Sequence, residues 1–248
     1  MKSPSAKCAA AAVLVVATLV GGGSLLLFAL FLWRGSFGVV DLGLEAPWLY
    51  LWDALLCAGF FGQHSVMVRR SFQTRWMAGI PAPARGASYA IASGLALFLV
   101  VLLWQESPLY HGEHDRPVVQ ILAAGWGLAA VIFVWSLAAL RTDVLGLAPL
   151  WGLLRGAAPR PPVLVVRGPY RFVRHPLYLA SLLVIWAGPE LSADRLLLDI
   201  LFTGWILVGA KLEERDLEDE LGDAYRRYRE AVPMLLPWRI PDAIGARK

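Results

Sequence analysis

The stretch that decides the fold runs from Cys8 to Trp33 and reads CAAAAVLVVATLVGGGSLLLFALFLW. It contains 26 residues without a charge. A membrane-spanning helix needs about 20 apolar residues, and the apolar part of a secretory signal peptide is shorter. We therefore expect a retained membrane helix. The composition agrees, because 58% of the residues are hydrophobic and only 17% are charged, unlike the balance of a soluble domain.

Further apolar stretches follow along the chain. Three have spanning length: Trp48 to Val68, Ala87 to Trp104 and Val118 to Leu140. Leu177 to Gly188 has only 12 residues, about 18 Å of helix against a hydrocarbon core of about 30 Å, so it cannot cross alone. We expect it to form a helical hairpin with Leu196 to Ala210. The sequence thus predicts an all-α integral membrane protein with about six transmembrane helices.

The basic residues predict the orientation in the membrane. Lys and Arg concentrate in short cytoplasmic loops, and with six spans 20 of the 23 fall on one side. The other side has only Arg34, Arg116 and Arg195. Both termini are therefore expected in the cytoplasm, and the Ala-, Arg-, Gly- and Pro-rich composition suggests a bacterial inner membrane. The net charge of +4 favours anionic lipid headgroups as contacts, and no nucleic-acid module is recognisable.

The chain after the sixth span predicts a cytoplasmic amphipathic helix. In KLEERDLEDELGDAYRRYREAVP, from Lys211 to Pro233, apolar and aromatic side chains recur at helical spacing. These are Leu217, Leu221, Tyr225 and Tyr228. We expect one membrane domain over residues 1–248, with four spans in 8–140 and a C-terminal core in 141–238.

Polar residues inside the spans are costly in lipid, which makes them candidates for function. Asp53 and Asp199 lie near the outer ends of their spans, so we expect both to reach interfacial water. His64 lies at the cytoplasmic end of its span, beside Gln63 and Ser65. Two interpretations stay open for it, a group that handles a proton and an interfacial histidine bonded to water.

A metal site is not expected. His111 and His114 stand in the outer loop with Glu113 and Asp115, but no second ligand cluster accompanies them. Neither a phosphate-binding loop, nor a dinucleotide-binding glycine pattern, nor a nucleophilic serine elbow occurs in the sequence.

The densest polar segment is RGPYRFVRHPLY, from Arg167 to Tyr178. A basic flank of a membrane helix explains its arginines and tyrosines, but not its Gly-Pro and His-Pro pairs, which restrict the backbone twice. Glu213 and Glu214 follow the sixth span directly, so the hairpin would bring them near the arginines and His175. A cationic ligand that carries a carboxylate would meet both charge signs there.

At these residues the chain resembles the membrane methyltransferases that include isoprenylcysteine carboxyl methyltransferase and phospholipid N-methyltransferases. Their C-terminal signature has the form GPYxxxRHPxY, then a hairpin, then EE, YxxY and VP, and it covers the last third of this chain. The resemblance implies a cytoplasm-facing site for the cofactor S-adenosylmethionine. The residues it places there are Tyr170, Arg174, His175, Pro176, Tyr178, Glu213, Glu214, Tyr225 and Tyr228.

A narrower resemblance, to methanethiol S-methyltransferases, extends over Gln63 to Trp76 and over the C-terminal end. It implies transfer of a methyl group to a small thiol such as methanethiol, giving a thioether such as dimethyl sulfide. We expect His64, with Arg69 nearby, to accept or stabilise the thiol proton. The chain departs from this family at Ala148-Pro149, where an Arg-Gln pair would stand, so the identity of the thiol stays open.

Two other functions remain open from the sequence. A lipid amine or a prenylcysteine carboxylate could accept the methyl group instead of a thiol. The chain could also be a non-catalytic membrane accessory protein of the NnrU type, which has part of the same architecture.

Overall fold

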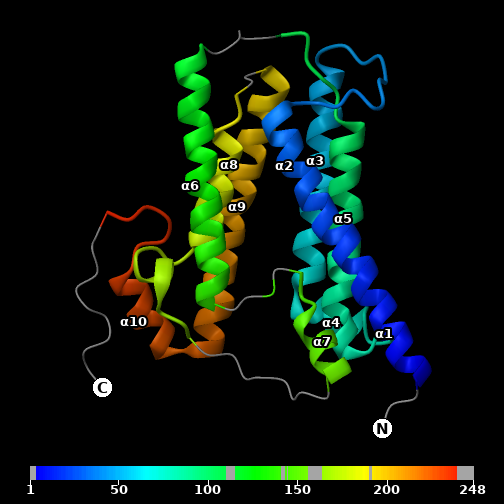
Figure 1. Cartoon of the computed structure of the whole chain (residues 1–248), viewed down its shortest axis with the longest axis vertical. Helices are drawn as coiled ribbons and strands as arrows, with labels where there is room; N and C mark the ends of the chain where they lie inside the picture. Colours follow the sequence, from blue (N-terminus) through cyan, green and yellow to red (C-terminus); the bar gives the residue numbers. More distant parts are fainter. Residues whose placement is uncertain are drawn as a thin grey trace. The chain divides into compact units, whose positions relative to one another are not determined.

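The computed structural model (Figure 1) describes residues 4–109, 115–140, 143, 145–155, 164–189 and 192–238, without the side chains of Pro4, Ala6 and Arg70. Every regular element in these ranges is a helix, as predicted. The chain forms two compact units. Unit 1 comprises Met1–Gly112, Asp143–Arg160 and Glu190–Leu201, and unit 2 comprises Glu113–Thr142, Pro161–Pro189 and Phe202–Lys248.

The helices divide between the units as follows. Unit 1 contains α1 (Pro4–Ala17), the π-helical η1 (Thr18–Gly22), α2 (Gly23–Arg34), α3 (Trp48–Val68), α4 (Arg70–Arg75), α5 (Ala82–Leu103) and α7 (Ala148–Arg155). Unit 2 contains α6 (Arg116–Leu140), the 3₁₀-helical η2 (Gly168–Arg171), α8 (Pro176–Trp186) and α10 (Asp223–Ala231). The long α9 (Ala193–Leu221) supplies residues to both.

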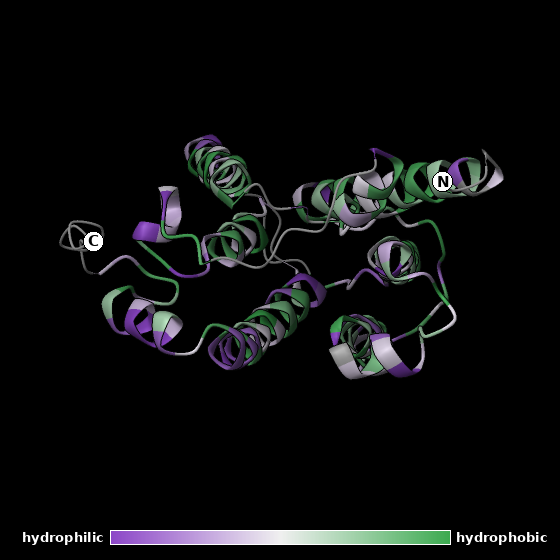
Figure 2. Ribbon diagram, turned by 90° about the horizontal axis from the view of Figure 1, so that it is seen from below, coloured by the Kyte–Doolittle hydropathy of each residue, from purple (hydrophilic) through white to green (hydrophobic). Residues whose placement is uncertain are grey.

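Three helical segments among the described residues are long and apolar enough to cross a membrane: Lys7–Arg34, Ala82–Leu103 and Arg116–Leu140. Their surfaces are apolar, with Leu26 70% and Ile121 69% exposed. Such side chains need lipid around them. Hydrophobic residues, green in Figure 2, make up much of the long helices. The protein is therefore a membrane protein, and the total of six spans stays a prediction.

The remaining apolar helices follow the sequence closely. Helix α3 has the bounds expected for the second span, Trp48–Val68. Helix α8 has 11 residues, so it is too short to cross alone, as expected. It begins at Pro176, because proline lacks the N–H group that a helix does not need in its first turn.

Helix α5 packs against α1, α2, α3 and α7 within unit 1. Small residues allow its backbone to approach its neighbours closely. A Cβ atom on Gly94 would stand 2.8 Å from the carbonyl oxygen of Val20. A Cβ atom on Gly86 would meet the carbonyl oxygen of Gly146, a glycine whose φ is +65°. These backbone contacts cannot move aside as a flexible side chain would, so glycine is required at both positions.

We expect Gly94→Ala to destabilise unit 1 by about 1–3 kcal/mol, because the added methyl group overpacks a contact between two backbones. Thermal unfolding in detergent, followed by helical circular dichroism, measures the change. Gly59→Ala is the matched control, since a Cβ atom there has nothing within 4 Å. Equal unfolding temperatures for the two variants would contradict the tight packing described here.

Buried polar groups join the ends of several segments in unit 1. The backbone N–H of Gln105 donates to Asp53 Oδ1 at 3.0 Å, and Arg195 Nε donates to Asp199 Oδ1 at 2.8 Å. Both carboxylates are buried, with exposures of 0% and 2%. The expectation that they reach interfacial water was therefore wrong. Each is instead held by a partner from the protein, which buried polar groups require.

In unit 2 the side chains of α8 and α9 pair in antiparallel order. Trp186 Nε1 donates to Thr203 Oγ1 at 2.9 Å, and Tyr178 Oη donates to Glu213 Oε2 at 2.6 Å. Tyr178 precedes Trp186 on α8, whereas its partner Glu213 follows Thr203 on α9. The two helices therefore run in opposite directions. The predicted hairpin requires this order.

The predicted amphipathic helix from Lys211 to Pro233 is wrong as a single element. Helix α9 continues without a break to Leu221, and α10 starts at Asp223. Gly222 between them has a φ of +56°, a left-handed conformation that ends a helix and favours glycine. The predicted apolar face is still formed across the two helices, because Leu217 and Leu221 of α9 pack against the buried Tyr225 and Tyr228 of α10.

Candidate active site

The site in unit 2 is built on the segment that leads into α8. Gly168 has a φ of +59°, and a Cβ atom on it would stand 2.9 Å from the Cβ atom of Ala139. The segment can therefore turn close against α6. His175 stands before Pro176 and has φ −121° and ψ 64°, since the residue before a proline is kept out of the helical region. The two Gly-Pro and His-Pro pairs thus fix the shape of this segment.

A second segment lies against this one and holds it by its backbone. The N–H of Arg174 donates to the carbonyl oxygen of Pro233 at 2.9 Å, and the N–H of His175 donates to that of Met234 at 3.1 Å. Tyr228 Oη donates to the carbonyl oxygen of Tyr170 at 2.6 Å. Pro233 and Met234, which follow α10, therefore serve to position Arg174 and His175.

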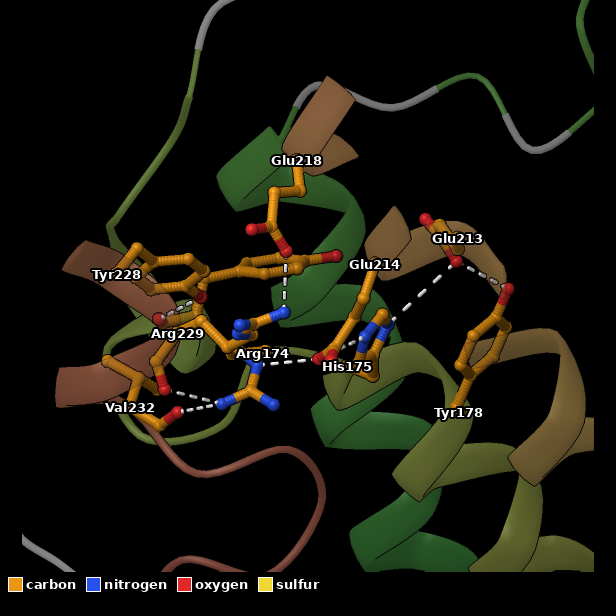
Figure 3. A network of polar contacts seen from close by, with 10 residues as sticks. Arg174, His175, Tyr178, Glu213, Glu214, Glu218, Tyr228, Arg229 and Val232 are labelled. Carbon is orange, nitrogen blue, oxygen red and sulfur yellow. Dashed lines mark hydrogen bonds and ion pairs between the residues drawn. The ribbon is translucent and has the colours of Figure 1, made fainter. Parts of the chain in front are cut away.

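The side chain of Arg174 joins α9 to the end of α10 (Figure 3). Its Nε donates to Glu214 Oε1 at 2.6 Å. Its Nη1 donates to the carbonyl oxygens of Arg229, at 2.8 Å, and Val232. A cation at the last carbonyls of a helix satisfies acceptors that have no partner within the helix. Arg174 thus caps α10 and holds the Glu214 carboxylate.

His175 lies between both glutamates. Its Nε2 is 3.2 Å from Glu214 Oε1, and its Nδ1 is 3.8 Å from Glu213 Oε2. The ring stacks on Tyr178, with centroids 5.2 Å apart and planes 9° apart. Tyr178 in turn donates to Glu213 (Figure 3). His175 and Glu214 are buried, whereas the Glu213 side chain is 47% exposed, so the cluster has one buried and one accessible carboxylate.

Three tyrosines line the same region. Burial raises the pKa of Tyr170, Tyr225 and Tyr228 well above the usual range of a phenol. Their hydroxyl groups therefore stay protonated at neutral pH. Tyr225 Oη is buried and has no hydrogen-bond partner among the described residues, although its pKa also responds to Glu214, Arg174 and Glu213. An unpaired buried hydroxyl beside charged groups is costly and fits a site that a polar ligand completes.

The structure thus brings together, within unit 2, all nine residues that the sequence predicted around a cofactor. Pro176 starts α8, and the other eight make the contacts given above. His64 and Arg69 lie in unit 1, where Arg69 separates α3 from α4.

Two residues beside Gln63 and His64 were not predicted from the sequence. Tyr89 Oη lies 2.6 Å from His64 Nε2, and Ser93 Oγ accepts from Gln63 Nε2 at 3.3 Å. Both stand one helical turn apart on α5. A tyrosine and a serine at that spacing in an uncharged span were the available signal.

The remaining candidates add little to the site. The described residues contain no group of three or more His, Cys, Asp or Glu side chains that could hold a metal ion. His111, Glu113 and His114 lie outside the described residues. Ala148 and Pro149, where the sequence departs from the thiol-methylating family, form the first residues of α7 in unit 1.

Comparison with known proteins places the chain in a family. No family model matches it, and no solved structure does. A methanethiol S-methyltransferase from a Pseudomonas species is 36% identical over 199 residues, 79% of this chain and 76% of that protein. The Mycobacterium tuberculosis methanethiol S-methyltransferase is 34% identical over 188 residues, 75% and 77% of the two chains. Pig Nurim is 26% identical over 179 residues, 67% of each chain. The chain therefore belongs to the methanethiol S-methyltransferase family and is a membrane-embedded methyltransferase.

Proposed function

We propose that the protein transfers the methyl group of S-adenosylmethionine to a small apolar thiol. Methanethiol is the model acceptor and dimethyl sulfide the corresponding product. The observation that carries the proposal is the cluster in unit 2, where Glu214 is held by Arg174 and His175 beside the unpartnered hydroxyl of Tyr225. The names of its relatives support the thiol as acceptor.

The residues of the cluster fit the amino-acid end of S-adenosylmethionine, which carries an ammonium, a carboxylate and a sulfonium. Glu213 is a carboxylate accessible to an ammonium group, and Tyr225 has a hydroxyl donor to offer a carboxylate. Arg174 and His175 would act through Glu214, while Tyr170, Tyr178 and Tyr228 would shape the walls. When bound, the sulfonium supplies a methyl group that is open to attack by a nucleophile.

The acceptor thiol must lose its proton, because the thiolate is the reactive form. In the proposed reaction its sulfur forms a bond to the methyl carbon, and the electron pair of the broken carbon–sulfur bond stays with the donor sulfur. The thiol proton passes to His64, with Arg69 stabilising the negative charge. Positioning and exclusion of water then supply most of the rate enhancement, since no covalent intermediate is needed.

We also propose that the protein crosses a bacterial inner membrane about six times, with both termini in the cytoplasm. Trp48, 64% exposed at the start of α3, and Trp76, 73% exposed after α4, suit the two interfaces that tryptophan prefers. A reporter that is active only outside the cytoplasm is expected to be active when fused after Arg34 and inactive when fused after Arg75. The reverse pattern would contradict this orientation.

A methyl-transfer assay tests the proposed reaction. Protein in detergent or nanodiscs is incubated with methyl-labelled S-adenosylmethionine and, separately, with alkyl thiols, phospholipids and a prenylcysteine. Label is expected in the thioether alone. Label in the lipid or the prenylcysteine would replace the thiol by another acceptor. Calorimetry with S-adenosylhomocysteine is the second measurement, and no heat of binding would favour a non-catalytic accessory role.

A further inference from the structure

Unit 1 has two ends that can be told apart by its contacts. Helices α3 and α5 are antiparallel, because Trp52 Nε1 donates to the carbonyl oxygen of Leu103 at 3.0 Å and His64 Nε2 lies 2.6 Å from Tyr89 Oη. The end of α3 therefore lies beside the start of α5. Helix α4 follows α3 at this end, and α7 packs against α1 and α5. Figure 1 shows α4, α7 and the start of α1 together there.

The two ends carry opposite net charge. The first, which we call the basic end, comprises residues 4–14, 64–92, 143 and 145–155. It has one acidic residue, Asp143, and six basic ones: Lys7, Arg69, Arg70, Arg75, Arg85 and Arg155. The other end comprises 34–53, 103–109 and 192–199, which are joined by hydrogen bonds of Gln105 and Asp194. It has six acidic residues and two basic ones. A ligand that charge attracts to the basic end is therefore anionic.

Helix α7 is fixed at the basic end by its apolar face. Leu150 is 2% exposed and packs in one cluster with Ala87 and Ala90 of α5. Ala87 is the first residue of the third predicted span. Helix α7 therefore lies where that span would leave the hydrocarbon core and meet the headgroups, as an amphipathic interfacial helix does.

The exposed side chains of α7 include Trp151 and Arg155, which stand one helical turn apart. The Arg155 Cζ atom lies 4.6 Å from the centroid of the Trp151 ring. Stacking occupies the flat face of the guanidinium group and leaves its N–H edge for a second partner. Arg155 forms no ion pair with any residue that the structure describes. The edge of its guanidinium can therefore bind an anion.

Helix α4 presents a second arginine beside a tryptophan at the same end. Arg75 is exposed, and Trp76, which follows it, is 73% exposed. The Trp76 ring stacks on Phe72, with centroids 6.5 Å apart and planes 24° apart. Within the described part of the chain Arg75 likewise has no carboxylate partner. Two separate helices thus combine an exposed tryptophan with an arginine that lacks a counter-ion.

We propose that the basic end of unit 1 binds the headgroups of anionic phospholipids, with Arg155 and Arg75 as the phosphate contacts. Tryptophan prefers the interface between lipid and water, and a guanidinium edge matches two phosphate oxygens. A zwitterionic lipid has the same phosphate, but its ammonium group compensates the charge that the basic end attracts. Net charge indicates such contacts only for the chain as a whole, whereas these residues assign them to one end of one unit.

The experiment compares Arg155→Gln and Arg75→Gln with the control Arg34→Gln. Arg34 is the exposed last residue of α2 at the other end of unit 1, so the control makes the same change of charge. Protein in a neutral detergent is titrated with phosphatidylglycerol, with phosphatidylcholine of the same acyl chains, or with glycerol phosphate. Thermal unfolding is followed by circular dichroism, and the half-saturating ratio of lipid to detergent gives the affinity.

Phosphatidylglycerol is expected to raise the unfolding temperature of the wild type more than phosphatidylcholine does. Its half-saturating ratio should increase about fivefold in Arg155→Gln and in Arg75→Gln, the usual contribution of one basic residue near an anionic surface. The ratio should stay unchanged in Arg34→Gln. Because both replaced side chains are exposed, each variant is expected to fold, and either one alone decides the test.

Three results would overturn the inference. The two lipids could stabilise the wild type equally, all three variants could weaken phosphatidylglycerol equally, or glycerol phosphate could act as strongly as the lipid. The last result would identify a free anion as the ligand. The titration uses neither methyl donor nor thiol, so its outcome does not depend on the proposed reaction.

Discussion

Replacing Glu214 by glutamine is expected to raise the Kd for S-adenosylmethionine about a hundredfold. Glu214 Oε1 accepts hydrogen bonds from Arg174 Nε and His175 Nε2 and is buried with both. Glutamine keeps an oxygen in place but removes the charge, so the Arg174 guanidinium stays buried without its counter-ion. Breaking a buried ion pair costs about 3–5 kcal/mol. Because the two side chains form one wall of the proposed site, much of this cost should appear in donor binding.

Calorimetry with S-adenosylmethionine and S-adenosylhomocysteine measures the affinity, and thermal unfolding measures the stability. Glu218→Gln is the matched control. Glu218 stands one turn further along α9 and pairs with Arg226 and Arg229, whose side chains are about half exposed. Exposed ion pairs contribute about 0–1 kcal/mol, so this variant should bind the donor normally.

A second variant keeps the test decisive if Glu214→Gln unfolds. Glu213→Gln alters a 47% exposed side chain, which the fold does not need, and should weaken donor binding about tenfold. Unchanged donor affinity in both variants would show that neither carboxylate contributes to donor binding.

The closeness of His175 and Glu214 could be predicted from the sequence because it follows from local signals. The Gly-Pro and His-Pro pairs determine the backbone wherever they occur, and a short apolar helix must return as a hairpin. Those two facts are enough to bring His175 near Glu214. The Arg174 contacts to the carbonyl oxygens at the end of α10 were not predicted, because they depend on where α10 ends in space.

The features that were predicted wrongly, or not predicted, have a common physical cause. Apolar periodicity continues through Gly222, so the pattern alone did not reveal the break that its positive φ allows. Asp53 and Asp199 looked like interfacial carboxylates because a sequence does not show which partners a fold will bring to them. The contact of Tyr89 with His64 was missed for the same reason, since Tyr89 lies on another helix. A sequence pattern does not reveal a contact between two residues that are distant in the sequence.

His64→Ala is expected to lower kcat for an alkyl thiol by about 10²–10⁴, the usual contribution of a positioned general base. Donor affinity should stay within twofold, because the proposed role of His64 is to take the thiol proton and not to bind the donor. His175→Ala is the matched control, since it removes the other described histidine and should weaken donor binding instead. Steady-state kinetics and calorimetry on the same preparations measure both quantities.

The choice of thiol decides whether His64 acts as a base. An alkyl thiol is mostly protonated at neutral pH and needs a proton acceptor, whereas an aromatic thiol is already largely ionised and does not. His64→Ala should therefore lose most of its activity with methanethiol or ethanethiol and little with thiophenol. Equal losses with all three thiols would instead indicate that the imidazole shapes the acceptor site by packing, as its ring contact with Phe60 at 5.5 Å would allow. The ratio of the activity loss with alkyl thiols to the activity loss with thiophenol thus measures proton transfer separately from packing.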